Sequence, residues 1–113
     1  MSHAISAGVH STVTTTKGPI GQPLSVATMA GEAMLPWLSE IEGFEGLLML
    51  SNEENGTTLV LTFWESREVA ERHRAARRQF REGMTQAAEV SIEDLTEYAV
   101  TFAHVGQLRT SPT

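Results

Sequence analysis

Apolar and β-branched residues are concentrated in two stretches near the middle of the chain. Residues 44–50 and 58–64 are mostly apolar, aromatic or β-branched, and the polar segment between them contains Asn55-Gly56. This dipeptide tolerates the positive φ angles of a tight hairpin turn. The pattern therefore predicts two adjacent antiparallel strands.

In two other stretches the apolar positions recur every three or four residues, which is typical of amphipathic helices. The first stretch covers residues 22–41, and Pro36 is expected to kink or break that helix near Leu35 because proline lacks a backbone N–H. After Trp64, Ser66 is expected to cap a second helix. The apolar stripe of the second helix consists of Val69, His73, Ala76, Phe80, Met84 and Ala87.

Two further strands complete the predicted fold. Residues 9–16 are rich in β-branched side chains and predict the first strand, while residues 95–105 predict the last. Ile92-Glu93-Asp94 is expected to mark the exit from the second helix. The order strand, helix, strand, strand, helix, strand is that of the ferredoxin-like βαββαβ fold of the α+β class, with an antiparallel four-stranded sheet and two helices on one face. One domain is expected at residues 9–105, between flexible ends at residues 1–8 and 106–113.

The second predicted strand carries apolar side chains on both faces. Phe44, Leu48 and Leu50 are expected on one face, and Leu47 and Met49 on the other. A strand with one face in water should instead alternate apolar with polar residues. Two helices on short connections cover only one face, so the sequence predicts that a second copy of the chain covers the other, giving a homodimer.

Composition and charge narrow the classes of function. The chain has 113 residues, a formal net charge of −6 and no cysteine, which favours one domain without disulfides. Its aliphatic runs are too short to span a bilayer and its start lacks the pattern of a secretory signal, so we expect a cytoplasmic protein without a membrane partner. Residues 67–81 are rich in arginine, but the acidic remainder and the lack of interleaved aromatic residues argue against nucleic acid.

The residues around the hairpin suggest a family. Two motifs resemble the antibiotic biosynthesis monooxygenase-like family of dimeric α+β barrels: Gly43-Phe44-Glu45-Gly46, which enters the second strand, and Thr62-Phe63-Trp64-Glu65-Ser66, which closes the third. The resemblance covers residues 9–105. It implies that two protomers pack their sheets face to face, and that each holds a small-molecule cavity between its helices and its sheet. Members of the family differ in reaction, so the resemblance indicates the fold more than the chemistry.

The resemblance implies a cofactor-independent monooxygenase-like protein that binds a small aromatic molecule of polyketide or quinol type and, if it is an enzyme, oxidises it. Such a reaction needs an apolar cavity, exclusion of water and a base. His73 is the candidate catalytic base, because the apolar stripe turns it toward the sheet and imidazole exchanges protons near neutral pH. A core histidine satisfied by hydrogen bonds is the competing interpretation. Candidate substrate-binding residues, each of which can equally be core packing, are Trp64, Trp37, Phe80, Met84, Phe44, Phe63 and Tyr98.

Two other functions remain open at this point. One is a non-catalytic dimeric module that binds a small molecule in the same cavity. The other is a heme-binding or heme-degrading relative, but the iron-ligating histidine of those proteins would fall near Glu82 or Gly83, and His73 stands where they carry a second tryptophan. We therefore expect no cofactor, and the absence of histidine and carboxylate spacings typical of metal ligands predicts no bound metal. His10 receives no weight, because it lies close to a start that is expected to fray.

Overall fold

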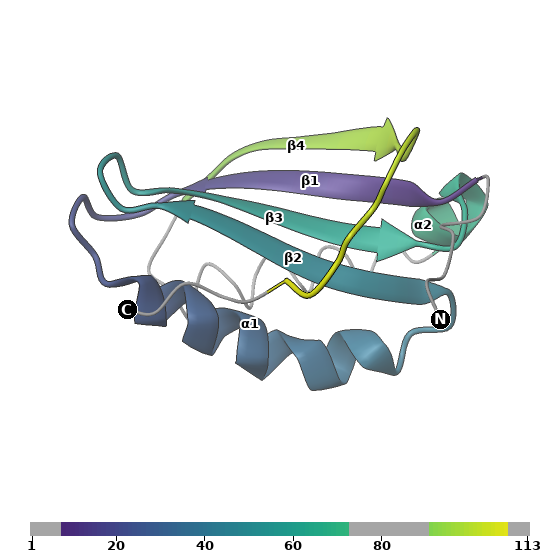
Figure 1. The fold of residues 1–113 in the computed structure, drawn as a ribbon, viewed down its shortest axis with the longest axis horizontal. Helices are drawn as coiled ribbons and strands as arrows, with labels where there is room; N and C mark the ends of the chain where they lie inside the picture. Colours follow the sequence, from purple (N-terminus) through teal and green to yellow (C-terminus); the bar gives the residue numbers. More distant parts are fainter. Residues whose placement is uncertain (1–7, 73–90, 109–113) are drawn as a thin grey trace.

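The computed structural model describes residues 8–72 and 91–108. The elements follow the order β1 (His10–Lys17), α1 (Leu24–Ser39), β2 (Phe44–Asn52), β3 (Thr57–Trp64), α2 (Arg67–Arg72) and β4 (Ser91–Ala99). The four strands form one antiparallel sheet in the order β2-β3-β1-β4. Helix α1 runs along one face of this sheet, beneath β2 and β3 (Figure 1). The ferredoxin-like α+β fold predicted from the sequence is confirmed.

The turn between β2 and β3 forms as the sequence predicts. Gly56 has φ +75°, a backbone conformation that residues other than glycine rarely adopt. The backbone N–H of Gly56 donates to the carbonyl of Asn52 at 2.9 Å, and the N–H of Thr57 donates to Asn55 Oδ1 at 2.9 Å. These local bonds fix the hairpin register, and that register sets which side chains reach each face of the sheet.

Helix α1 is continuous through Pro36, so the predicted interruption is not a break. Pro36 and Glu32, the residue whose carbonyl loses its bond, are both exposed, so water can satisfy that carbonyl. The opposite side of the helix is buried. Its residues Ala30, Met34 and Leu38 pack with Val60 of β3 into the main hydrophobic cluster.

A bulge at Glu45 corrects the predicted faces of β2. Phe44 pairs with Trp64 and Gly46 pairs with Phe63, so Glu45 has no place in the ladder. Phe44 therefore lies on the helix side with Leu47 and Met49, which pack against the same cluster. The prediction that Phe44 shares a face with Leu48 and Leu50 is wrong, because strict alternation fails where the strand carries an extra residue.

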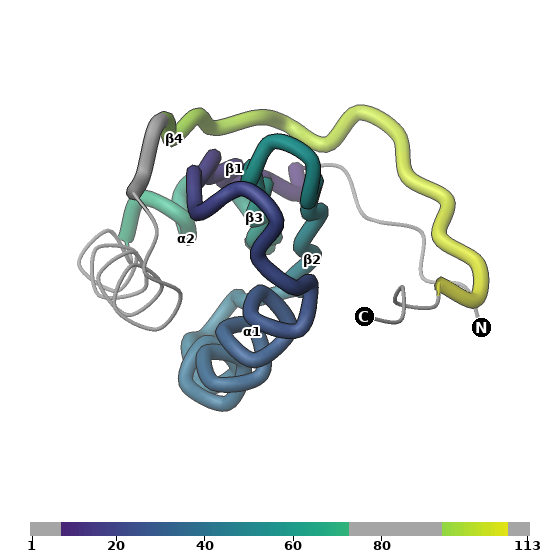
Figure 2. The backbone as a smooth tube through the Cα atoms, turned by 90° about the vertical axis from the view of Figure 1, so that its left-hand side faces the viewer, coloured from purple at the N-terminus to yellow at the C-terminus, as the bar shows by residue number. Residues whose placement is uncertain are grey.

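The last strand begins and ends earlier than predicted. It covers Ser91–Ala99 instead of residues 95–105, and residues 92–94, predicted to mark the helix exit, lie inside it. The strand ends where its partner does, since His10 is opposite Ala99 and the N–H of Val100 makes a final bond to the carbonyl of Val9. Residues 101–108 have no regular structure and are exposed. Figure 2 shows this segment running away from β4, on the side of the sheet opposite α1.

Residues paired directly across antiparallel strands point to the same face, so the register assigns each residue to a side. The helix side has Phe44, Trp64 and His10 in one row. The outer side has Leu48, Leu61 and Val13, which are half-buried. Both faces of the sheet are thus apolar in β2 and β3, as the sequence predicts.

Among the described residues, no helix has the length and apolar character needed to cross a membrane.

Candidate functional site

The helix side of β1 is buried but polar. His10, Thr12, Thr14 and Thr16 all lie on this side, and each retains 8% or less of its surface. A run of alternating threonines favours an extended strand because β-branched side chains fit a pleated sheet. Burial of their hydroxyl groups is costly unless each finds a hydrogen-bond partner. The question is therefore which of these buried hydroxyl groups have hydrogen-bond partners.

The hydroxyl of Thr16 has a hydrogen-bond partner, but among the described residues the hydroxyl of Thr12 does not. Thr16 Oγ1 donates to the carbonyl of Thr58 at 3.2 Å. The carbonyl of Thr12 accepts a longer bond, 3.4 Å, from Thr62 Oγ1. Thr12 Oγ1 itself is buried, and the residues that the structure describes offer it no hydrogen-bond partner. The strip therefore has an unused hydrogen-bonding group beside Thr62.

Next to this group, His10 and Glu97 form a pair between β1 and β4. The distance from His10 Nε2 to Glu97 Oε1 is 3.1 Å. Glu97 is directly opposite Thr12 in the sheet, so the pair and the Thr12 hydroxyl share one face and adjacent rows. The His10 side chain is 10% exposed and the Glu97 side chain 32% exposed. The pair thus extends from the buried strip toward the surface at the β4 edge.

Sequence reasoning missed this pair. The sequence reasoning gave His10 no weight because it lies close to the start of the chain. The alternation of Thr12, Thr14 and Thr16 nevertheless extends back to His10, and it could have predicted that His10 shares their face of the sheet. Its link to Glu97, 87 positions away, depends on the pairing of β1 with β4.

Two predicted binding residues lie in the same row of the sheet as His10. Trp64 is completely buried and is paired across the sheet with both His10 and Phe44. The Trp64 and Phe44 rings meet edge to face, with centroids 5.8 Å apart and planes at 74°. Such a geometry is favourable for aromatic pairs. The three side chains therefore form one row across β2, β3 and β1.

The turn after β3 holds this row in place. Ser66 Oγ accepts a hydrogen bond from the N–H of Val69 at 3.2 Å, which confirms the predicted cap of α2. Glu65 N–H donates to the carbonyl of Gly43 at 2.8 Å. Gly43 has φ +89°, and an added Cβ there would collide with Val69 Cγ1. The two sequence motifs of the hairpin therefore meet in space and pack Val69 of α2 against Trp64.

The other predicted binding residues are placed elsewhere. Trp37 is half-buried against the α1 cluster. Phe63 and Tyr98 both pair with Ser11, so they lie on the outer side of the sheet, away from Trp64. His73, Phe80 and Met84 lie outside the described residues. Of the predicted site, the structure brings together Trp64 and Phe44, and the roles of all these residues stay predictions.

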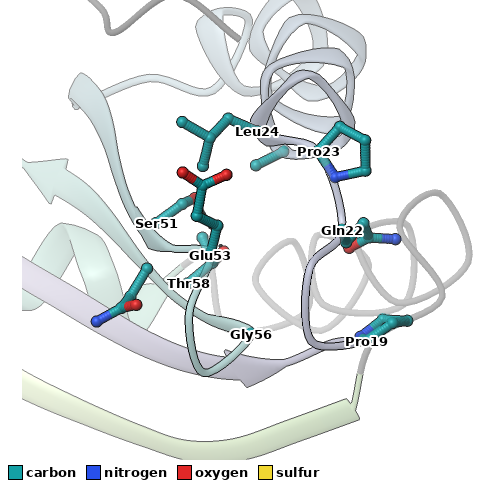
Figure 3. A pocket seen from close by; sticks show the side chains of 10 residues that line it. Pro19, Gln22, Pro23, Leu24, Ser51, Glu53, Gly56 and Thr58 are labelled. Atoms are coloured by element: carbon teal, nitrogen blue, oxygen red, sulfur yellow. Dashed lines mark hydrogen bonds between the residues drawn. The ribbon is translucent and has the colours of Figure 1, made fainter.

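A shallow depression elsewhere on the surface contains none of these residues. It lies between the β2–β3 turn and the segment that joins β1 to α1, and Figure 3 shows Gln22, Glu53 and Thr58 around it. Two backbone bonds tie its walls together, from Gly18 N–H to the Gly56 carbonyl at 2.8 Å and from Gly21 N–H to the Glu53 carbonyl at 3.1 Å. The described residues contain no group of histidine and carboxylate side chains that could hold a metal ion.

Comparison with known proteins identifies the fold class. No protein-family model matches the sequence, and no curated protein is similar to it. Solved structures of antibiotic biosynthesis monooxygenases, however, share its fold, and the resemblance predicted from the hairpin motifs is confirmed at that level.

Three of these structures show the extent of the likeness. The monooxygenase from the gene ActVA-Orf6 of Streptomyces coelicolor, in complex with nanaomycin D, is 16% identical, with a TM-score of 0.59 over 89% of this chain and 94% of that one. A proposed antibiotic biosynthesis monooxygenase from Bordetella bronchiseptica is 13% identical, with a TM-score of 0.60 over 84% of this chain and 99% of that one. Rv0793 from Mycobacterium tuberculosis is 13% identical, with a TM-score of 0.52 over 87% and 99%. At these identities the likeness shows the fold.

Proposed function

We propose that this protein is a cofactor-independent monooxygenase of the antibiotic biosynthesis type, which binds a small aromatic molecule of polyketide or quinol class. The observation that carries the proposal is the fold shared with the nanaomycin D complex over 89% of the chain. The row formed by Phe44, Trp64 and His10 supports it, because aromatic surface next to a polar group suits a phenolic ligand.

The proposed reaction uses dioxygen and needs no metal or flavin. For an anthrone, the ring CH2 loses both hydrogens, one oxygen atom of O2 becomes the new carbonyl, and the other leaves as water. The reaction starts when a base removes a proton from the substrate, because the resulting electron-rich anion transfers an electron to O2 more readily. His73 is the base predicted from the sequence. Trp64 and Phe44 wall the ligand, and Trp37, Phe80 and Met84 are the remaining predicted contacts.

Binding and oxidation are tested separately. Nanaomycin D is titrated into the protein while tryptophan fluorescence is followed, and oxygen uptake is measured with 1,8-dihydroxyanthrone and a panel of hydroquinones. We expect saturable binding and substrate-dependent uptake, with uptake reduced at least tenfold in His73→Ala while binding is retained. His104→Gln is the matched control, since His104 is exposed in the segment after β4. Binding without uptake across the panel would instead make the protein a non-catalytic binding module.

We also propose that the active form is a homodimer. The apolar outer side of β2 and β3, with Leu59, Leu61 and Phe63 half-buried, supports this, because a protomer gains by covering such a surface. Leu61→Lys should convert the dimer to a monomer in sedimentation velocity at micromolar concentration. Met29→Lys, on the exposed side of α1 with 67% of Met29 accessible, should leave the dimer intact. A wild-type protein that sediments as a monomer would contradict this part of the proposal.

A further inference from the structure

The pair formed by His10 and Glu97 has the arrangement of a general base with a positioning carboxylate. An ionised carboxylate can only accept a hydrogen bond, so the contact at 3.1 Å places a proton on Nε2 of His10. In a neutral ring the other nitrogen, Nδ1, then carries the lone pair. A neutral imidazole fixed in one tautomer in this way is ready to take up a proton at its other nitrogen.

The Thr12 hydroxyl is the second observation that points to a ligand. It is buried, with only 2% of Thr12 accessible, and among the described residues it has no partner. A buried hydroxyl without a hydrogen bond is destabilising, and native structures rarely retain one without a reason. Thr16 lies on the same strand and the same face, and its hydroxyl is bonded to the Thr58 carbonyl. A threonine hydroxyl on this face of β1 can therefore find a partner within the sheet. A ligand oxygen beside Thr12 would complete the strip.

The Glu97 end of the pair lies nearer the surface than His10 does. Glu97 is on the edge strand of the sheet and its side chain keeps 32% of its surface accessible, whereas His10 keeps 10%. The completely buried Trp64 is directly opposite His10, and Phe44 continues the row beyond it. A flat phenolic molecule that enters from the edge would therefore meet polar groups first and aromatic surface beyond them.

We propose that His10 Nδ1 and Thr12 Oγ1 bind a phenolic oxygen of the ligand, and that His10 takes its proton while Glu97 holds the imidazole. The O–H bond of the phenol breaks, a bond from Nδ1 to that proton forms, and the electron pair stays on the phenolate. Glu97 stabilises the imidazolium that results. This inference rests on the proposed function and adds to it a proton acceptor on β1, in a residue that the sequence reasoning had set aside.

The experiment measures the ionisation of a bound phenol. With 1,8-dihydroxyanthrone as the probe under anaerobic conditions, absorption spectra report how much of the bound molecule is the anion. We expect a clear anion band with the wild-type protein, at least tenfold weaker binding of the anion in His10→Gln, and a smaller anion band with retained binding in Glu97→Gln. His104→Gln is the control. Circular dichroism confirms that each variant is folded, and Thr12→Val, expected to bind the probe about tenfold more weakly, replaces His10→Gln if that variant is unfolded.

A second measurement addresses the tautomer without any ligand. Nitrogen NMR of the imidazole should find the proton of His10 on Nε2 in the wild-type protein, and a mixture of tautomers in Glu97→Gln. A proton on Nδ1 in the wild-type protein would overturn the inference. So would an unchanged anion band in both His10→Gln and Thr12→Val when the wild-type protein binds the probe, and in that case the proposed function would stand. If neither the probe nor nanaomycin D binds to the wild-type protein, both proposals fail.

Discussion

Thr12 and Thr16 form a matched pair for testing whether a buried hydroxyl is unsatisfied. Both lie on β1, face the same side and retain 2% of their surface, but only Thr16 has a bonded hydroxyl. An unsatisfied buried polar group costs about 1–3 kcal/mol, and a typical hydrogen bond contributes about 1 kcal/mol. Valine is close in shape to threonine and favours strands. Thr12→Val should therefore raise the free energy of unfolding by about 1 kcal/mol, and Thr16→Val should lower it by about 1 kcal/mol.

The two variants are compared by urea unfolding, followed by circular dichroism and by tryptophan fluorescence. In thermal melts of a chain of this size, a change of about 1 kcal/mol in the free energy of unfolding shifts Tm by about 4 °C. The two variants should therefore differ by about 8 °C in Tm. Equal slopes in urea would show that the variants change the folded state's stability without changing the surface exposed on unfolding. If Thr12→Val is destabilised as much as Thr16→Val, the Thr12 hydroxyl is bonded in solution, and it no longer supports a ligand site.

Further substitutions test the turn that holds Trp64 and the core beneath α1. Gly43→Ala should lower the free energy of unfolding by about 3 kcal/mol, because φ is +89° and the new methyl group would collide with Val69; Gly106→Ala, with nothing within 4 Å, should have no effect in the same thermal melts. Ser66→Ala should cost about 1 kcal/mol through loss of the α2 cap, and unchanged urea stability would show that the cap contributes nothing. Leu38→Ala should cost about 3 kcal/mol in chemical unfolding, since Leu38 is 1% exposed at the centre of the α1 cluster.

The features that local sequence determines were predictable. The turn at Asn55-Gly56, the helix beneath the sheet and the cap at Ser66 each depend on residues a few positions apart. The bulge at Glu45 was not predictable, because it exists only in the pairing of β2 with β3 and leaves no mark in the alternation of residues.

The site was less predictable than the fold. The limits of β4 follow from where β1 ends, and not from the acidic residues that resemble a helix terminus. The contact between His10 and Glu97 likewise arises only when the first and last strands pair. His73, the base that the helical spacing favours, lies outside the described residues and stays a prediction.

The order β2-β3-β1-β4 places the first strand of the chain in the interior of the sheet. Residues 44–64 can form their hairpin early during synthesis, and β1 can then join β3. The other side of β1 remains without hydrogen-bond partners until Ser91–Ala99 has been made. Until then a ribosome-bound chain has an open, threonine-rich strand edge, and such edges can pair with other chains. Pairing with the last strand closes that edge and brings Glu97 to His10 in the same step.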